Sequence, residues 1–268
     1  MEKSKVIIIL FLLFRITQMY GQTDAPERNI DDTGFFLSLG ANYTNFQDLK
    51  YSNVQMQGIG IAGGLGWHKL TEKQAWEASL NIHYSNQSTS LNSFADANAI
   101  NANLKFSWMR NLKQHSPLKI YLGVALDSDL NFRQDGELGN NSFYYLQGNT
   151  VSAQGMLRRK LNEKWDISYG LSIGLLSMAK ESTSFAFSAP QEYLESGEFD
   201  YLSADDVIKP FKRLQFEPIG KYTRLESKLA VHHGKWGLGY LWNFTKYRQI
   251  KNYEVGTAAH RVTATFTF

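Results

Sequence analysis

The sequence predicts an all-β fold, a transmembrane antiparallel up-and-down β-barrel of about ten strands with short connections at one end and long ones at the other. Three observations predict it. Apolar and polar residues alternate in ten segments, the connections between these segments alternate between short and long, and tryptophans cluster near the short connections. Alternation with a period of two places successive side chains on opposite faces of a strand, as a membrane barrel requires.

Residues 1–21 are expected to form a signal peptide. Two lysines precede an apolar run from Val6 to Phe14 that is too short to span a bilayer. Gly21 is the expected cleavage position because it is small. Residues 22–268 then form a single barrel domain, and they contain no apolar run long enough for a transmembrane helix.

The composition excludes several classes of function. The chain contains no cysteine, so it has no disulfide framework and no thiolate metal site. Its formal net charge is +3, which is small for 268 residues, so no nucleic-acid partner is expected. Neither a phosphate-binding loop nor a zinc motif occurs, and no cofactor or metal is expected for the barrel itself.

Ten segments are expected to be strands, and their connections alternate in length. The segments are 33–46, 55–69, 73–87, 97–110, 117–129, 143–160, 163–177, 213–231, 235–248 and 256–268. The short connections are 70–72, 111–116, 161–162 and 232–234, and the long ones are 47–54, 88–96, 130–142, 178–212 and 249–255. Membrane barrels have short periplasmic turns and longer extracellular loops, so both chain ends are expected in the periplasm.

The tryptophans favour a membrane barrel over a soluble one. All six fall on the apolar faces of their segments, and five lie within a few residues of a short connection: Trp67, Trp76, Trp108, Trp165 and Trp236. An indole ring has an apolar body and an N–H donor, so it prefers the boundary between lipid and water. We therefore expect a girdle of indole rings at the periplasmic rim.

Charges of both signs are expected inside the barrel. The inward positions are Lys105, Lys119, Arg158, Arg224, Lys228 and Arg261 against Glu77, Asp127, Asp166 and Glu226. Barrels of about eight strands are just filled by side chains, so ten strands predict a filled or narrow lumen with paired charges. In the segment 213–231, Pro218 and Gly220 predict a bulge. The expected function is that of a structural, binding or scaffold protein that acts through its extracellular loops.

The longest expected loop, 178–212, is acidic and carries interleaved aromatic residues such as Tyr193, Phe199 and Tyr201. Long loops in compact proteins are usually functional or disordered. Two interpretations stay open, a docking surface for a protein partner and a solvated acidic loop that repels anionic polysaccharide.

The C-terminus, residues 261–268, reads RVTATFTF and alternates strictly up to a terminal aromatic. It resembles the last strand of bacterial outer-membrane β-barrels, whose terminal Phe is read by the barrel-assembly machinery. The resemblance implies that Phe268 is the assembly signal and that the chain resides in the outer membrane of a Gram-negative cell. It also implies contact with outer-membrane lipid and lipopolysaccharide.

The pattern His-Tyr-Ser-Asn at residues 83–86 is the sharpest candidate for chemistry. It resembles the His-x-Ser-Asn motif of outer-membrane phospholipase A and of the lipid A 3-O-deacylases. The resemblance implies an alternative function, a lipid esterase with Ser85 as nucleophile and His83 as its base, and calcium is the one cofactor that this alternative admits.

In those families a third residue, twelve positions beyond the serine, orients the histidine. Ala97 occupies that position here, and the polar residues Asp96 and Asn98 flank it. An imidazole needs a polar partner to fix its tautomer, so Asp96 and Asn98 are the candidates for that role. Alternation points His83 and Ser85 into the barrel, whereas those families present the pair to lipid.

Two other polar patterns carry no catalytic signature. Asp127 and Asp129 form an inward acidic pair near the expected extracellular mouth. The ten-stranded omptin proteases combine such pairs with an Asp-x-His, which this sequence lacks. A calcium loop that begins at Asp127 fails because Phe132 stands where a Gly is required. His232 and His233 lie in an expected turn, where solvated imidazoles are the ordinary case.

Overall fold

The computed structural model describes residues 32–48, 55–89, 92–112, 118–135, 143–181, 215–217, 220–250 and 253–268. They form the strands β1 (Asp32–Asp48), β2 (Gln55–Leu70), β3 (Gln74–Thr89), β4 (Asn92–Asn111), β5 (Leu118–Asp135), β6 (Phe143–Lys160), β7 (Trp165–Glu181), β8 (Gln215–Glu217), β9 (Tyr222–His233), β10 (Trp236–Ile250) and β11 (Tyr253–Thr267). In this described part of the chain, no helix is long and apolar enough to cross a membrane.

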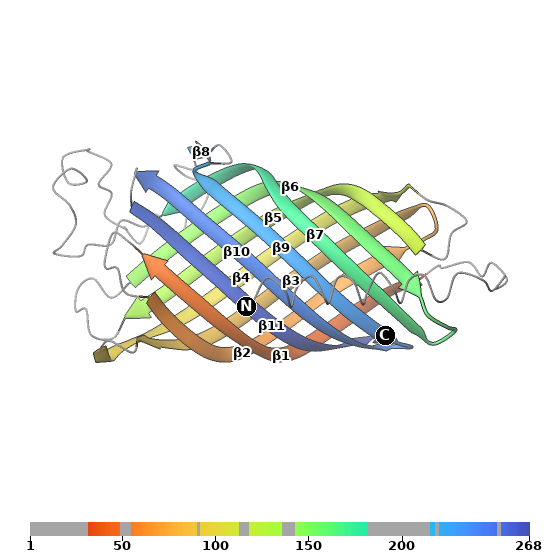
Figure 1. The fold of residues 1–268 in the computed structure, drawn as a ribbon, viewed down its shortest axis with the longest axis horizontal. Coiled ribbons are helices and arrows are strands. Elements are labelled where there is room, and N and C mark those ends of the chain that lie inside the picture. The colour runs from red at the N-terminus through yellow and green to blue at the C-terminus, as the bar shows by residue number, and fades with distance from the viewer. Residues whose placement is uncertain are drawn as a thin grey trace, which may run out of the picture.

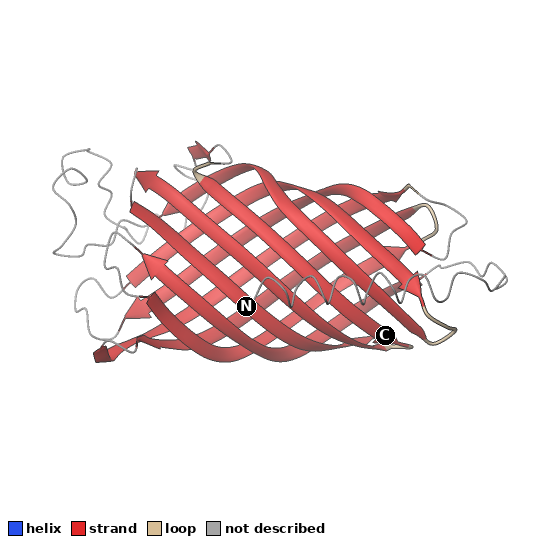
Figure 2. Cartoon of the chain, viewed as in Figure 1, coloured by secondary structure: helices blue, strands red, loops and turns tan. Residues whose placement is uncertain are grey.

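Ten long strands close into an antiparallel barrel (Figures 1 and 2). Around the ring the order is β1, β2, β3, β4, β5, β6, β7, β9, β10 and β11, and the pairing of β11 with β1 completes it. One further strand, β8, is a short segment that pairs with the last residues of β7, at the end of the barrel that we expect to be extracellular. The predicted ten-stranded up-and-down barrel is confirmed.

The connections at the end of the barrel that we expect in the periplasm, called the periplasmic end below, are short, as predicted. Residues 71–73 join β2 to β3, and residues 234–235 join β9 to β10. Gly234 has φ 58°, a left-handed conformation that favours glycine and suits a two-residue hairpin turn. The predicted signal peptide 1–21 and the residues 182–212 of the predicted long loop lie outside the described residues.

Two connections that we expected to be long are corrected by the structure. Strand β3 runs to Thr89 and β4 begins at Asn92, so most of 88–96 is strand. Likewise β10 runs to Ile250 and β11 begins at Tyr253, which leaves two residues between them. Hairpin hydrogen bonds continue beyond the apolar band because they need no buried face, and alternation of hydrophobicity does not report them.

The predicted irregularity in the segment 213–231 is a break in the strand. The segment divides into β8 and β9 on either side of Pro218 and Gly220. Opposite the break, β7 carries a bulge at Leu175, because Ser152 pairs with Gly174 while Val151 pairs with Leu176. The bulge in β7 therefore lies beside the break between β8 and β9, and both irregularities fall at the same place in the barrel wall.

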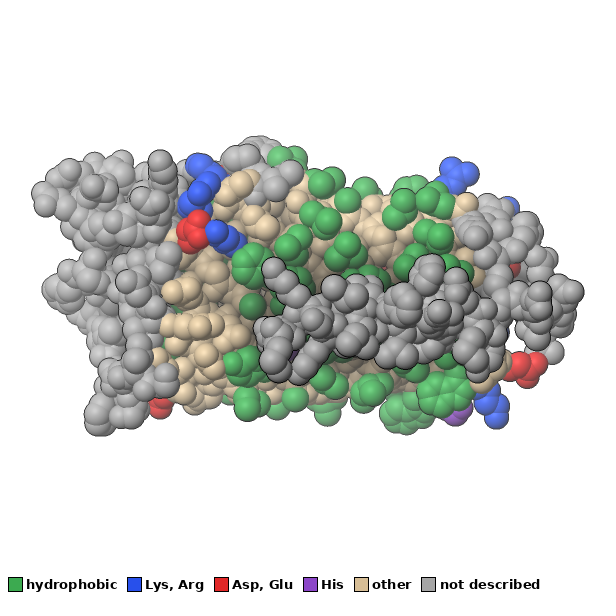
Figure 3. Space-filling view, viewed as in Figure 1, with side chains coloured by type: hydrophobic (Ala, Val, Ile, Leu, Met, Phe, Trp, Pro, Cys, Tyr) green, Lys and Arg blue, Asp and Glu red, His purple; other side chains and the backbone are tan. Residues whose placement is uncertain are grey.

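The outer surface is an apolar band. Leucine, isoleucine, valine and aromatic side chains from every long strand are exposed on it, and Figure 3 shows them between the two ends. Near the short turns, Trp165 packs on His233 at 4.5 Å between ring centroids, and Trp236 packs on Phe266 at 4.8 Å. These two indole rings thus lie exposed on the outer face beside short turns, as predicted, and a girdle of five rings at the periplasmic interface stays a prediction.

Candidate functional site

The middle of the lumen is occupied by a buried ion network centred on Arg224. Its Nε lies 2.6 Å from Asp129 Oδ2, and its Nη2 lies 3.1 Å from both Asp127 Oδ1 and Glu226 Oε2. Asp127 and Asp129 are alternate residues of β5, as are Arg224 and Glu226 of β9, so each strand projects both of its side chains inward. The Arg224 side chain is 1% exposed. Such a charge is tolerated because three carboxylates surround it.

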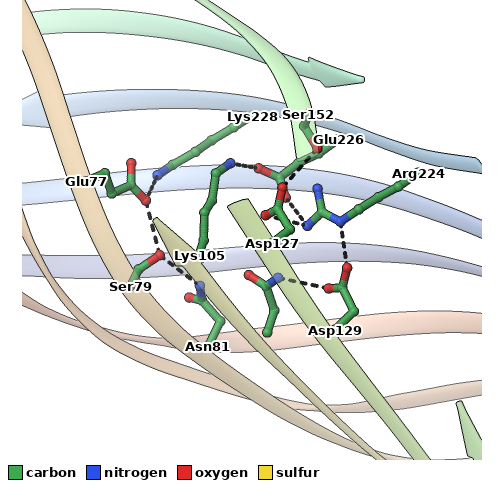
Figure 4. A network of polar contacts seen from close by, with 11 residues as sticks. Glu77, Ser79, Asn81, Lys105, Asp127, Asp129, Ser152, Arg224, Glu226 and Lys228 are labelled. Atoms are coloured by element: carbon green, nitrogen blue, oxygen red, sulfur yellow. Dashed lines mark hydrogen bonds and ion pairs between the residues drawn. The ribbon is translucent and has the colours of Figure 1, made fainter. Parts of the chain in front are cut away.

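Two lysines form ion pairs across the barrel, one of them within this network and one beside it (Figure 4). Lys105 Nζ on β4 lies 2.6 Å from Glu226 Oε1 on β9, and both side chains are buried. Lys228 Nζ on β9 lies 3.9 Å from Glu77 Oε1 on β3, which also accepts a hydrogen bond from Ser79. Neither pair joins neighbouring strands, so the ion pairs bridge the lumen itself.

An apolar cluster fills the lumen at the extracellular end. Its members come from six strands and are Phe46, Leu146, Ala179, Tyr222, Tyr247 and Val255. The Tyr222 ring lies against Gly148 of β6, where a Cβ atom would meet the phenol. Arg133 of β5 reaches over the Phe46 ring of β1, 4.3 Å from its centroid. We call this cluster the upper plug.

A second buried cluster lines the lumen toward the periplasmic end, on the four neighbouring strands β2 to β5. Leu70, Ala75, Met109 and Tyr121 form a buried cluster there, which we call the lower plug. Arg158 binds Asp166 through two hydrogen bonds, of 3.0 and 2.8 Å, and lies 3.6 Å from Asp32 on the opposite side of the ring. Side chains therefore fill or cross the lumen at three heights.

Most of the predicted inward charges are brought together as opposed pairs. Lys105, Arg224 and Glu226 meet in one network, and Lys119 Nζ lies 3.6 Å from Glu72 Oε1 near the lower plug. Arg261 is buried and faces inward, but it forms no ion pair with the described residues. In the same part of the chain, no three His, Cys, Asp or Glu side chains are arranged to hold a metal ion.

His83 and Ser85 also face the lumen and are buried. The Ser85 hydroxyl accepts hydrogen bonds from Thr44 Oγ1 at 3.0 Å and Gln87 Nε2 at 3.4 Å. The bond from Thr44 on β1 passes over β2, where Gly58 and Gly60 leave room between β1 and β3. The His83 Nδ1 atom has no hydrogen-bond partner among the described residues. Both side chains are therefore separated from lipid by the barrel wall.

The two candidates for orienting His83 lie on the other face of β4. Asn98 points outward, where its Oδ1 accepts a hydrogen bond of 2.5 Å from Tyr84, and Asp96 is exposed on the same face. Ala97 points inward but has no polar group. The structure brings none of the three into position to hold the imidazole, and the catalytic roles of His83 and Ser85 stay a prediction.

Sequence reasoning missed three features that the structure shows. Asp32 begins β1 and Glu72 lies in the turn between β2 and β3, where alternation assigns no face, yet both pair with lumenal cations. The upper plug escaped notice because its aromatic residues occupy positions that alternation marks as polar. The third feature is an outward cluster at the extracellular end of β10, where Lys246 and Arg248 share Glu254.

No protein-family model matches the chain, and no curated protein matches it. Among solved structures, it is similar to the outer membrane protease OmpT from Escherichia coli, with 9% identity and a TM-score of 0.51 over 92% of this chain and 99% of that one. The translocator domain of the autotransporter NalP from Neisseria meningitidis also matches, with 12% identity and a TM-score of 0.41 over 99% and 98%. At these identities the similarity to OmpT shows the fold alone: the chain has the fold of an outer-membrane β-barrel.

Proposed function

We propose that this protein is a non-conducting barrel of the Gram-negative outer membrane, which acts as an anchor or scaffold and presents its extracellular segments for binding. The observation that carries the proposal is the set of buried side chains that occupy the lumen at three heights: the upper plug, the ion network around Arg224, and the lower plug with the pair of Arg158 and Asp32. A passage for ions or solutes needs a continuous polar path, and these layers interrupt it.

The outer-membrane location is supported by the apolar band and its aromatic girdle, together with the predicted signal peptide. The acidic segment 178–212 remains the predicted docking surface for a protein partner. No observation in the lumen favours the lipid esterase, since Ser85 is held by Thr44 and Gln87 and faces away from lipid.

Conductance across a planar lipid bilayer tests the proposal. The refolded protein is expected to insert without discrete current steps, and its folding is verified by heat-modifiable migration and circular dichroism. A matched porin-fold barrel of known conductance serves as the positive control. Regular unit conductance from the verified fold would overturn the filled-lumen proposal.

The presentation of extracellular segments is tested separately on intact cells. Externally added protease is expected to cut within 182–212 and to spare the described strands, including β7 up to Glu181. Cleavage that needs permeabilised cells would place this segment in the periplasm and contradict the proposed orientation.

A further inference from the structure

The outward cluster at the extracellular end of β10 differs from the charges inside the barrel. Lys246 Nζ lies 2.5 Å from Glu254 Oε2 of β11, and Arg248 Nη1 lies 3.9 Å from Glu254 Oε1. The two cationic side chains are 37% and 40% exposed. In Figure 3 the blue and red side chains lie toward the two ends of the green apolar band. We call these three residues the Lys246 patch.

The height of the Lys246 patch follows from the spacing along β10. Every second residue from Trp236 to Phe244 is an outward apolar or aromatic side chain, and Lys246 is the next. Trp236 belongs to the periplasmic girdle, and Lys246 follows it by ten residues. With about 3.3 Å per residue and a tilt of about 40°, that separation is roughly 25 Å along the membrane normal, the usual height of the apolar band. Lys246 therefore lies at the level of the outer-leaflet headgroups.

Aromatic rings lie directly below the Lys246 patch on the lipid side. Trp242 and Phe244 of β10 are stacked, with their ring centroids 6.3 Å apart. His260 of β11 is paired with Trp242 across the strands, and its Nδ1 lies 2.7 Å from the hydroxyl of Tyr240. Tyr43 of β1 packs against the same imidazole, with the two ring centroids 6.2 Å apart. This shelf offers apolar ring faces to acyl chains and polar atoms to the interface.

Charge balance identifies the group that fits the Lys246 patch. Two cations share the single carboxylate of Glu254, so one positive charge is in excess. The Arg248 Nη2 atom donates to the Gly220 carbonyl at 3.4 Å, which holds the guanidinium near the barrel wall. An Arg and a Lys side by side, at headgroup level and above an apolar surface, match a phosphate that is attached to acyl chains.

We propose that the Lys246 patch binds the phosphate of a phosphorylated outer-leaflet lipid, lipopolysaccharide in a Gram-negative envelope, whose acyl chains lie on the aromatic shelf. The proposal rests on the outer-membrane location proposed above. It does not depend on the filled lumen, because every residue of the Lys246 patch and of the shelf faces outward.

Native mass spectrometry of the refolded full-length barrel, with diphosphorylated lipid A as the probe, tests the proposal. The double variant Lys246→Gln and Arg248→Gln is expected to lose at least about tenfold in affinity. The matched control, Lys69→Gln with Lys235→Gln, removes two exposed cations from the periplasmic end and is expected to bind like the wild type. Circular dichroism verifies the fold of each variant.

Two further probes separate the phosphate from the rest of the lipid. Dephosphorylated lipid A is expected to bind the wild type as weakly as the diphosphorylated lipid binds the double variant. Equal binding of the two lipids, or an equal loss in the control variant, would overturn the proposal. Inorganic phosphate at millimolar concentration is expected not to displace the lipid; efficient displacement would assign the Lys246 patch to a free anion. Neither outcome of the lipid-binding experiment changes what is expected in the conductance experiment, so the two proposals can fail separately.

Discussion

Lys105 Nζ and Glu226 Oε1 lie 2.6 Å apart, although three strands separate β4 from β9 by the shorter way around the barrel. The contact therefore spans the lumen and ties two walls of the barrel together. Both side chains are buried, so if the pair were broken, water could not hydrate either charge in its place.

A double-mutant cycle measures this contact directly. Lys105→Met and Glu226→Gln are expected to show a coupling energy of about 1–3 kcal/mol, because the pair is desolvated and hydrogen-bonded. Urea unfolding in lipid vesicles, followed by tryptophan fluorescence, supplies the free energies of unfolding. The control cycle uses Lys228→Met and Glu77→Gln, whose atoms lie 3.9 Å apart with the lysine 46% exposed, and we expect less than about 1 kcal/mol there. Equal coupling in both cycles would contradict the assigned burial.

Arg224→Met is expected to destabilise the barrel more than any single lysine change. The substitution leaves Asp127, Asp129 and Glu226 close together without their common cation, which costs about 3–5 kcal/mol in the free energy of unfolding. Adding Asp127→Asn and Asp129→Asn is expected to restore much of the loss, since neutral amides need no counter-ion. If the triple variant were no more stable than Arg224→Met, the charges would not be the cause.

The packing of the upper plug predicts that valine substitutions at two glycines have different effects on stability. Gly148→Val is expected to destabilise the protein by about 1–3 kcal/mol, because its Cβ displaces the buried ring of Tyr222. Gly256→Val is the control: a Cβ at this outward position meets nothing within 4 Å, and a β-branched residue suits a strand. The same urea titration reports both changes, and a neutral Gly148→Val would show that Tyr222 does not pack as described.

The sequence predicted the barrel well because one face of each strand must be apolar, and that requirement is visible residue by residue. The same parity correctly placed Arg224 and Glu226 in the lumen beside Asp127. It did not predict that Lys105 contacts Glu226, because a pair across the lumen depends on the order of the strands around the barrel and on their tilt. It also missed the upper plug, since Phe46 and Tyr247 are apolar residues on the inner face, where alternation predicts polar ones.

Phe268 is the predicted assembly signal, and its surroundings separate that role from a structural one. Its side chain is 64% exposed, and its backbone N–H donates to the Phe35 carbonyl at 3.0 Å. Phe268→Ser keeps this backbone bond, so refolding in detergent and the urea midpoint are expected to stay unchanged. In cells, the same variant is expected to reduce the amount of folded barrel in the outer membrane several-fold. A matched loss of stability in vitro would contradict a pure signalling role.

Fatty-acid release from phospholipid and from lipopolysaccharide tests the remaining esterase alternative, with and without calcium. We expect no release by the verified fold, because Ser85 and His83 face the lumen and His83 Nδ1 has no partner among the described residues to fix its tautomer. Ser85→Ala and His83→Ala are the decisive comparisons.

Release by the wild type that both variants abolish would establish a hydrolase. It would also require the extracellular half of β3 to turn these side chains toward lipid, against the register of β3 with β2 and β4. Release that both variants retain would point to a contaminant, since no other serine of β3 lies two residues from a histidine.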